Sequence, residues 1–231
     1  MDARNGVLGK IERRRAVDDV HAAIRDAILS RQFPPGMRLN VDELAAQLGV
    51  SLTPVRSAIQ LLAAEGLVDV HSRSGTYVAT LSRRDLAETF DIRCALECLA
   101  AEHAAPALTD QQIADARRLL AVLGRPIRND VQRQAHEQAN RDLHQILIEA
   151  SDNKRLADMY DSLQAHIAMG RLHRQDQNWQ SRIPVEQEEH EEIVAAMEKR
   201  DAHALTKALR RHITRAKAVL LEAIPADQES A

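Results

Sequence analysis

The 231-residue sequence has few aromatic residues, only two cysteines and no long apolar run. Phe, Trp and Tyr make up 2% of the chain, so its core must be built from Leu, Ala, Ile and Val, which favours helices. Cys94 and Cys98 lie one helical turn apart in an apolar stretch, and we expect a reduced, buried pair rather than a disulfide or a metal site. No segment approaches the roughly 20 apolar residues of a membrane span, and the N-terminus lacks the apolar centre of a signal peptide. We therefore expect a cytoplasmic protein.

The charge is modest and unevenly divided. The net charge is −3, with 10 Lys+Arg and 9 Asp+Glu in residues 1–80 and 21 and 25 in the remainder. A nearly neutral first part is a weak electrostatic footprint for nucleic-acid binding, so any such function must be argued from motifs. The length suits two modest domains, each with its own core.

Residues 51–78 have the pattern of a helix followed by a small hairpin. Thr53 is expected to cap the helix, with Pro54 at its first position, where a fixed φ suits the helix and a missing N–H costs nothing. Residues 67–70 and 76–78 have the composition of two short strands around a polar loop. This order is typical of the back half of a winged helix-turn-helix.

A shorter helix is expected just upstream, over residues 41–50, ending at Gly49. The two helices and the hairpin predict a winged helix-turn-helix over residues 17–80, after a polar arm at residues 1–16. In such a unit the N-terminal end of the second helix faces the base edges of the DNA major groove. The pattern predicts DNA contacts at seven positions: Ser51, Thr53, Arg56 and Ser57 on the helix, Arg38 before it, and His71 and Gly75 in the wing.

The motifs PPGMRL, ELAAQLGVS, TPVRSAIQLLAAEGLV and GTYV resemble the DNA-binding domain of the GntR family of bacterial transcription regulators, almost without gaps. The resemblance implies a regulator that binds double-stranded DNA. Leu52 departs from the family pattern, because the family usually has there an arginine that reads a guanine. The preferred operator is therefore expected to differ from the family's common one.

Residues 82–223 have helical periodicity and no strand pattern, and residues 224–231 form a short tail. Capping-box pairs open the first two expected helices, at Ser82 with Asp85 and at Thr109 with Gln112. Four more helices are expected at roughly 129–150, 154–176, 183–199 and 202–223. The fold class predicted is mainly α: an N-terminal winged helix-turn-helix with a small β-hairpin wing, and a C-terminal all-α six-helix bundle.

The second half also resembles a known unit, through DIRCALE, NRDLHQILIEASDNKRL and EEHEEIVAAMEKRDAHALTKALRRHI. These segments are similar to the effector domain of the FadR subfamily of GntR regulators, and the six-helix VanR-type FCD domain is the closest in length. The resemblance implies a domain that binds an effector and forms dimers.

Three histidines have a spacing that predicts a metal site. Asn140 and His144 are four apart and share a helix face. His190 and His212 each lie about 11 residues from the break at Asp201, so they should be level across an antiparallel helix pair. Three imidazoles in a bundle core suit Zn²⁺ or Ni²⁺ with coordination positions left open. The FadR-type resemblance implies the same four positions, and the alternative is ordinary histidines satisfied by hydrogen bonds.

Two arginines are candidates for binding an effector. Arg93 lies among apolar neighbours, and a buried arginine needs an anion. Its partner is Glu97 at i+4 or another helix's carboxylate, or, as the resemblance suggests, an organic acid held near the metal. Arg171 is a weaker candidate of the same kind.

These features favour a ligand-responsive, homodimeric transcription regulator that reads a palindromic operator with two helices related by a twofold axis. Repression relieved by a small carboxylate effector is the prediction, although activation fits the sequence equally well. The competing class is a metal-dependent hydrolase with an accessory winged-helix domain, since three histidines with an open position suit a catalytic zinc. The sequence has no HExxH and no recognisable general base, so an enzyme is not expected.

Overall fold

The computed structural model describes residues 14–172, 179–222 and 224. The chain divides into two compact units, residues 1–80 and 81–231, and each is described by itself. The predicted polar arm and C-terminal tail lie almost wholly outside the described residues. Among the helices that are described, none is long and apolar enough to cross a bilayer.

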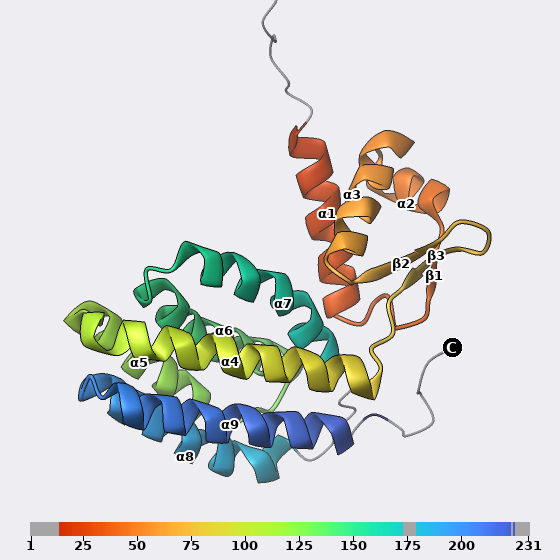
Figure 1. Ribbon diagram of the computed structural model, residues 1–231. Helices are drawn as coiled ribbons and strands as arrows, with labels where there is room; N and C mark the ends of the chain where they lie inside the picture. Colours follow the sequence, from red (N-terminus) through yellow and green to blue (C-terminus); the bar gives the residue numbers. More distant parts are fainter. Residues whose placement is uncertain (1–13, 173–178, 223, 225–231) are drawn as a thin grey trace, which may run out of the picture. The chain divides into compact units, whose positions relative to one another are not determined.

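The first unit contains three helices and a small antiparallel sheet in its described part (Figure 1). The strands lie in the order β1-β3-β2, so β3 is central. The elements are α1 (Arg14–Leu29), β1 (Arg38–Leu39), α2 (Val41–Leu48), α3 (Leu52–Ala64), β2 (Val68–His71) and β3 (Gly75–Val78). The expected hairpin is present, as β2 and β3.

The third strand, β1, was not predicted. Arg38 and Leu39 pair with Tyr77 and Thr76 of β3, so Arg38 belongs to the sheet and not to a loop. A strand of two residues has no periodicity to read. It forms because the free edge of β3 offers backbone groups to a segment that is distant in the chain.

The start of α3 differs from the prediction by two residues. Ser51 is the N-cap, with φ −72° and ψ 166°, and Leu52 is the first helical residue. Thr53 is therefore not the cap, and Pro54 is the third helical residue. This placement is tolerated because the N–H groups of the whole first turn lack partners within the helix. Gly49, with φ 66°, ends α2 in the left-handed conformation that favours glycine.

One face of α3 packs into the core of the first unit. Val55, Ala58, Ile59 and Leu62 are buried, and α3 contacts both α1 and α2. Val20, Ile24 and Ile28 of α1 are buried at the same spacing of about one helical turn. The opposite face of α3 therefore remains available for a partner.

The second unit is a bundle, with six helices in its described part. These are α4 (Arg83–Ala107), α5 (Asp110–Leu123), α6 (Asp130–Ala150), α7 (Lys154–Leu172), α8 (Trp179–Glu198) and α9 (Ala202–Glu222). Both predicted capping boxes are present, at the starts of α4 and α5. The long α4 contacts α6, α7 and α9, and α9 also contacts α8. The predicted fold class is thus confirmed.

The bundle core is aliphatic, as the scarcity of aromatic residues predicted. Leu86, Leu143, Leu147 and Leu209 are among its fully buried members. Cys94 and Cys98 are free thiols, with Cys98 buried and Cys94 half-buried. Burial, together with the neighbouring Cys94, raises the pKa of the Cys98 thiol to about 12, so this thiol stays protonated and unreactive at neutral pH.

Candidate metal centre and DNA-binding surface

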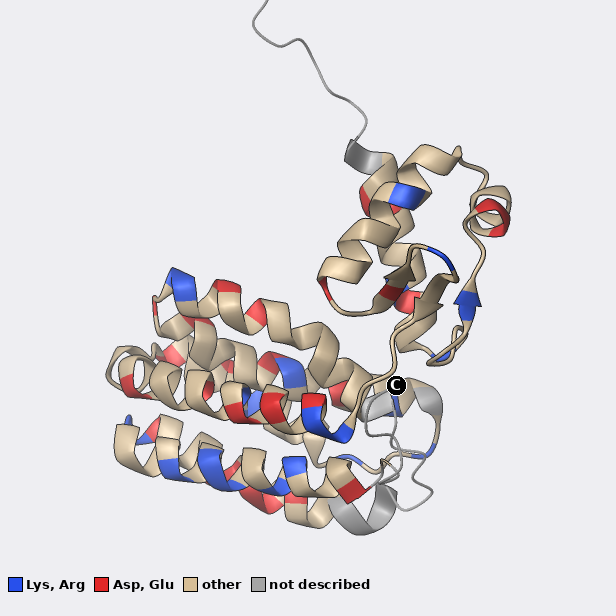
Figure 2. Cartoon of the chain, turned by 45° about the vertical axis from the view of Figure 1, so that its right-hand side comes forward, with Lys and Arg blue, Asp and Glu red and all other residues tan. Residues whose placement is uncertain are grey.

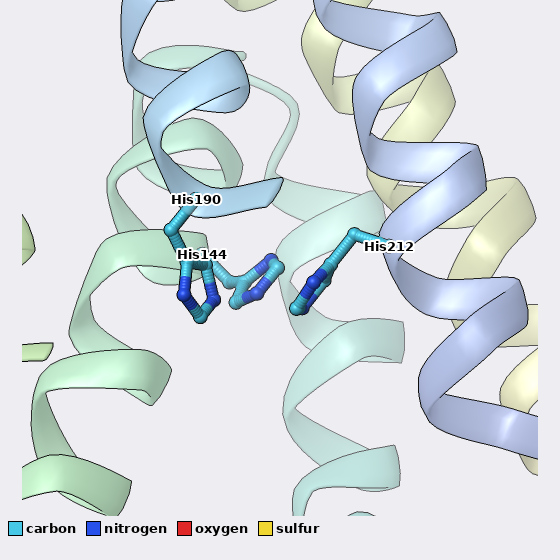
Figure 3. A group of neighbouring side chains, drawn as sticks. All are labelled: His144, His190 and His212. Atoms are coloured by element: carbon cyan, nitrogen blue, oxygen red, sulfur yellow. The ribbon is translucent and has the colours of Figure 1, made fainter. Parts of the chain in front are cut away.

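Three histidines from three helices meet in the middle of the bundle (Figure 3). His144 comes from α6, His190 from α8 and His212 from α9, and all three are buried. One nitrogen of each lies within 4.8 Å of the others. The rings of His190 and His212 are 4.6 Å apart between centroids, so the two residues are level across α8 and α9 as the count from Asp201 indicated.

Asn140 lies beside this triad, one turn before His144 on α6. Its side chain is 9% exposed, and its Oδ1 is 2.9 Å from Nε2 of His190. An amide oxygen is a neutral donor atom, so the four side chains together offer three imidazoles and one oxygen without negative charge.

Two buried glutamates hold two of the three imidazoles. Glu97 Oε2 is 2.6 Å from Nδ1 of His144, and Glu189 Oε2 is 2.9 Å from Nδ1 of His212. An ionised carboxylate only accepts hydrogen bonds, so each Nδ1 carries a proton, and Nε2 is the nitrogen that a neutral ring would offer to a metal ion. Metal-binding histidines almost always show this arrangement, because the carboxylate sets the tautomer and the orientation of the ring.

The environment of Glu97 keeps it ionised. Burial by itself would raise the pKa of Glu97, but the charge of Arg93 and the hydrogen bond with His144 hold that pKa well below its usual range. Arg93 donates from Nε to Glu97 Oε1 at 2.6 Å, and Tyr160 of α7 donates to the same oxygen at 3.0 Å. The i+4 pairing considered for Arg93 is therefore present.

His144 and His190 are held in the neutral form. Burial lowers the pKa of His144 to about 4, despite the opposing effect of Glu97, and burial also places the pKa of His190 well below its usual value. Nε2 of His144 and Nδ1 of His190 are buried and, within the described part of the chain, have no hydrogen-bond partner. Neutral imidazoles with uncommitted lone pairs are the form that binds a metal ion.

A cavity of about 50 Å³ adjoins the triad. It has room for a few water molecules at most. Arg93, Asn140 and His212 line it, and so does Arg215, which follows His212 by three residues on α9. Arg215 donates from Nε to Glu189 Oε1 at 2.6 Å, and its Nη2 is buried with no hydrogen-bond partner among the described residues. The side chain of Arg171 lies outside the described part of the structure.

Three residues of this site were not singled out from the sequence. Glu97 was considered only as a partner of Arg93, and its contact with His144 joins α4 to α6. The glutamates beside His190 could not be placed in the site from the sequence, and Arg215 was missed. Both Glu189 and Arg215 had a local signal: Glu189 directly precedes His190, and Arg215 lies one turn after His212. Which way these side chains point depends on how α8 and α9 pack, which spacing alone does not determine.

The predicted DNA contacts of the first unit lie on α3 and on the small sheet. Ser51, Thr53 and Arg56 are exposed, and Ser57 is half-buried. The side chain of Ser51 makes no capping hydrogen bond, so its hydroxyl is not committed to the helix end.

The wing is organised around Gly75 and Tyr77. Gly75 has φ 122°, and a Cβ atom there would lie 3.1 Å from Nε of Arg38, so the glycine allows Arg38 to pack closely against the wing. Tyr77 donates a hydrogen bond to the backbone oxygen of Ser74 at 2.8 Å and makes an edge-to-face contact with His71. Arg38, His71 and Gly75 thus lie together on β1, β2 and β3.

The winged helix-turn-helix and the helical bundle define a DNA-binding transcription regulator with a separate effector domain. Comparison with protein families supports this class: residues 16–78 match the bacterial regulatory proteins of the gntR family, and residues 88–215 match the FCD domain. The chain belongs to the GntR family and carries an FCD domain.

Individual relatives are regulators as well. An uncharacterised HTH-type transcriptional regulator in an unstable DNA locus of Streptomyces ambofaciens is 30% identical over 195 residues, 84% of this chain and 80% of that protein. The HTH-type transcriptional repressor RspR of Escherichia coli K12 is 27% identical over 202 residues, 84% of each chain. The structure of E. coli McbR/YncC has the same fold, with a TM-score of 0.77 and 24% identity over 90% of this chain and 97% of that one. The relatives are regulators and not enzymes, so the hydrolase alternative is set aside.

Proposed function

We propose that this chain is a ligand-responsive repressor of the FadR subfamily, with a VanR-type effector domain. It binds a palindromic operator as a homodimer in the cytoplasm, and it senses a small organic acid through a metal ion in the bundle. The observation that carries this proposal is the convergence of three buried imidazoles, two of which have a carboxylate behind them. Buried polar atoms in a folded core are normally hydrogen-bonded, so two buried histidine nitrogens without a partner among the described residues favour a binding site over an ordinary core.

Asn140, His144, His190 and His212 are the proposed metal ligands. Imidazole donors with one oxygen suit Zn²⁺ or Ni²⁺. A bound divalent ion supplies a positive charge and open positions for a carboxylate. Asn140 is a neutral ligand, so none of the four ligand side chains would offset the positive charge of a bound ion. An anionic effector is therefore favoured.

Arg93 and Arg215 are the proposed partners of the acid, and Arg171 stays a candidate. The first two line the cavity that His212 also lines, and the buried Nη2 of Arg215 lies 3.9 Å from Glu186 Oε1 without a hydrogen bond to a described residue. The cavity of about 50 Å³ is far smaller than the roughly 300 Å³ or more of typical ligand pockets. An effector must therefore displace side chains or helices as it binds. That displacement gives the ligand different affinities for two states, which is what a switch requires.

The homodimer is proposed to form through α4 and α9. Ile92 and Leu99 of α4 are 48% and 40% exposed and lie two turns apart. Beside them a groove of about 470 Å³ runs between α4 and α9, with Phe90, Cys98 and Ile213 among its lining residues. A second copy of this chain is the occupant that we propose.

The charges around the groove support that occupant. The groove is lined by Asp91 and Glu102 from α4 and by Arg210 and Lys217 from α9. Figure 2 shows the acidic residues along α4 and the basic ones along α9. Asp91 and Lys217 are already paired within one chain at 2.7 Å. A twofold axis that brings the α4 of one copy to the α9 of the other would therefore leave Glu102 and Arg210 as the opposite charges that meet. At 1.5 Å per residue, α4 is about 37 Å long, and each partner of a stable complex buries roughly 800 Å².

The metal is tested by measuring the metal content of the untagged protein, purified without chelator. The wild type is expected to carry about one divalent ion per chain, and His190→Ala to lose it. The matched control is His203→Ala, an exposed histidine on α9, which should keep the ion. A wild type that takes up neither Zn²⁺ nor Ni²⁺ on incubation would contradict the proposed site.

The dimer is tested by light scattering at micromolar concentration. Leu99→Glu together with Ile92→Glu should give monomers, because charges would enter an apolar contact on both sides of the axis. Met159→Glu, at a position on α7 that is 56% exposed, is the control and should remain dimeric. A monomeric wild type refutes the homodimer, while an unaffected double variant places the interface elsewhere.

Operator binding is tested by fluorescence anisotropy with DNA from the promoter region of the protein's own gene. If the protein binds this DNA tightly and added metal-coordinating acids weaken the binding, the result supports a repressor that its ligand releases from DNA. Binding that such acids strengthen points to activation or co-repression. Affinity no greater than for random DNA, with and without metal, refutes the proposed regulator.

A further inference from the structure

The chain passes from the first unit to the bundle through one exposed residue, Thr80. Ala79 belongs to the first unit, because its N–H donates to the backbone oxygen of Leu67 at 3.0 Å. Leu81 belongs to the bundle, because it is buried in the hydrophobic core there. Ser82 then caps α4. A movement of the first turn of α4 therefore moves the point at which the DNA-binding unit is attached.

The first residue of α4 holds the end of α9. Arg83 donates from Nη1 to the backbone oxygen of Leu221, in the last turn of α9, at 2.6 Å, and to that of Ile224, just beyond the helix, at 2.7 Å. The last carbonyls of a helix have no partner within it, and they form the negative end of its dipole. The guanidinium satisfies one of these acceptors, complements the dipole and fixes the chain past the helix end.

The contacts of the neighbouring residues stay within α4. Arg84 pairs with Glu88 of the same helix, and Asp85 bonds back to the N-cap Ser82. Among the side-chain hydrogen bonds of residues 82–85 in the described structure, those of Arg83 are the ones that reach α9. Arg83 is therefore the polar link between the first turn of α4 and the last turn of α9.

The same helix α9 carries part of the proposed metal site. His212 is a proposed ligand, and Ala216 and Leu220, farther along α9, line the adjoining cavity. From His212 to Leu221 the helix is continuous and, at 1.5 Å per residue, rises about 14 Å. Because α9 packs along α4 (Figure 1), this stretch connects the candidate metal centre directly with Arg83.

We propose that Arg83 is a positioning residue that couples occupation of the metal site to the start of α4, and so to the junction with the DNA-binding unit. This coupling rests on the metal-binding function proposed above. An ion that fixes His212 stabilises α9 toward its last turn. The two hydrogen bonds of Arg83 extend that stabilisation to the first turn of α4, so the two segments open and close together.

Amide hydrogen exchange of the full-length protein tests this coupling with Zn²⁺ alone as the ligand. An opening that releases the ion is suppressed about 100-fold when free Zn²⁺ is about 100 times its dissociation constant. In the wild type, the amides of α9 around His212 and those of residues 86–89, which bond to the first turn of α4, should both slow by this factor. In Arg83→Met the amides around His212 should still slow, while residues 86–89 should exchange at their metal-free rate.

Two further variants separate the coupling from a merely structural role. Arg83→Lys keeps a charged donor and should retain more of the Zn²⁺ response in residues 86–89 than Arg83→Met does. Arg84→Met removes the adjacent arginine, whose side chain is 83% exposed, and should retain the whole response. A change in thermal stability that is the same with and without Zn²⁺ is what a structural role alone predicts.

The contrary outcomes distinguish this coupling from the metal site itself. If Zn²⁺ slows residues 86–89 of Arg83→Met as much as those of the wild type, the coupling through Arg83 is overturned, whatever the stability of the variant. It is also overturned if Zn²⁺ slows α9 of the wild type and leaves residues 86–89 unchanged. If no segment of the wild type responds to Zn²⁺, the proposed metal site is refuted, and the coupling with it.

Discussion

Replacing Glu97 by Gln tests whether the buried network behind His144 acts as the structure indicates. Glu97 is fully buried, and one carboxylate receives hydrogen bonds from Arg93, Tyr160 and His144. Glu97→Gln keeps the shape and removes the charge. Arg93, 2% exposed, then loses its ion-pair partner, and breaking a buried pair in this way costs about 3–5 kcal/mol of unfolding free energy.

The same substitution should weaken the proposed metal site. His144 loses the carboxylate that holds its proton on Nδ1 and orients its ring, a change that typically lowers metal affinity about 10–100-fold. The double variant Arg93→Met/Glu97→Gln separates the loss of stability from the loss of metal affinity. Without the unpaired cation, most of the lost stability should return, while the metal affinity should stay low. Glu149→Gln, at an exposed position on α6, is the matched control and should change neither property.

Two assays give these quantities. Urea denaturation of the chelator-treated protein, followed by circular dichroism, reports the unfolding free energy. Competition with a chromophoric chelator reports the metal affinity. If Glu97→Gln bound metal as tightly as the wild type while His144→Ala bound none, Glu97 would not be orienting His144. An unchanged denaturation midpoint would show that the pair with Arg93 contributes nothing to folding.

Three further predictions concern the two units. Arg56→Ala should leave thermal unfolding unchanged because Arg56 is exposed, but it should weaken operator binding by about 1–3 kcal/mol per half-site, and equal affinity by anisotropy would exclude it from the interface. Gly75→Ala should destabilise the wing by about 1–3 kcal/mol, because a φ of 122° is unfavourable for alanine. Amide exchange in β2 and β3 should then be faster than in the wild type. Exchange rates in the variant equal to those of the wild type would contradict this strain. The folded-state pKa values of His144, about 4, and of His190 lie below the unfolded value of about 6.5. The metal-free protein should therefore be most stable above pH 6.5 and lose unfolding free energy toward pH 4, by about 3 kcal/mol for His144 alone. Urea midpoints that do not change between pH 7 and 4.5 would refute the neutral, buried state of these two histidines.

The features that depend on near neighbours in the chain could be predicted from the sequence. The helix-turn-helix and the hairpin have local signals, including Gly49 at the end of α2 and the capping boxes that open α4 and α5. Asn140 and His144 were paired by the helical repeat. His190 and His212 could be placed level because a short connection joins α8 to α9, which makes a count along the chain equivalent to a distance in space.

The remaining features depend on contacts between segments that are distant in the chain. The strand β1 exists only through its pairing with β3, and no pattern within two residues could reveal it. Glu97 reaches His144 across 47 positions because α4 packs on α6. Repeat spacing tells which residues share a face of a helix, but the rotation of that helix against its neighbours is set by the packing of the whole core. The sequence by itself therefore determined the family, the fold class and the candidate ligands, and only the tertiary structure decided which carboxylates hold the imidazoles and which arginines line the cavity beside them.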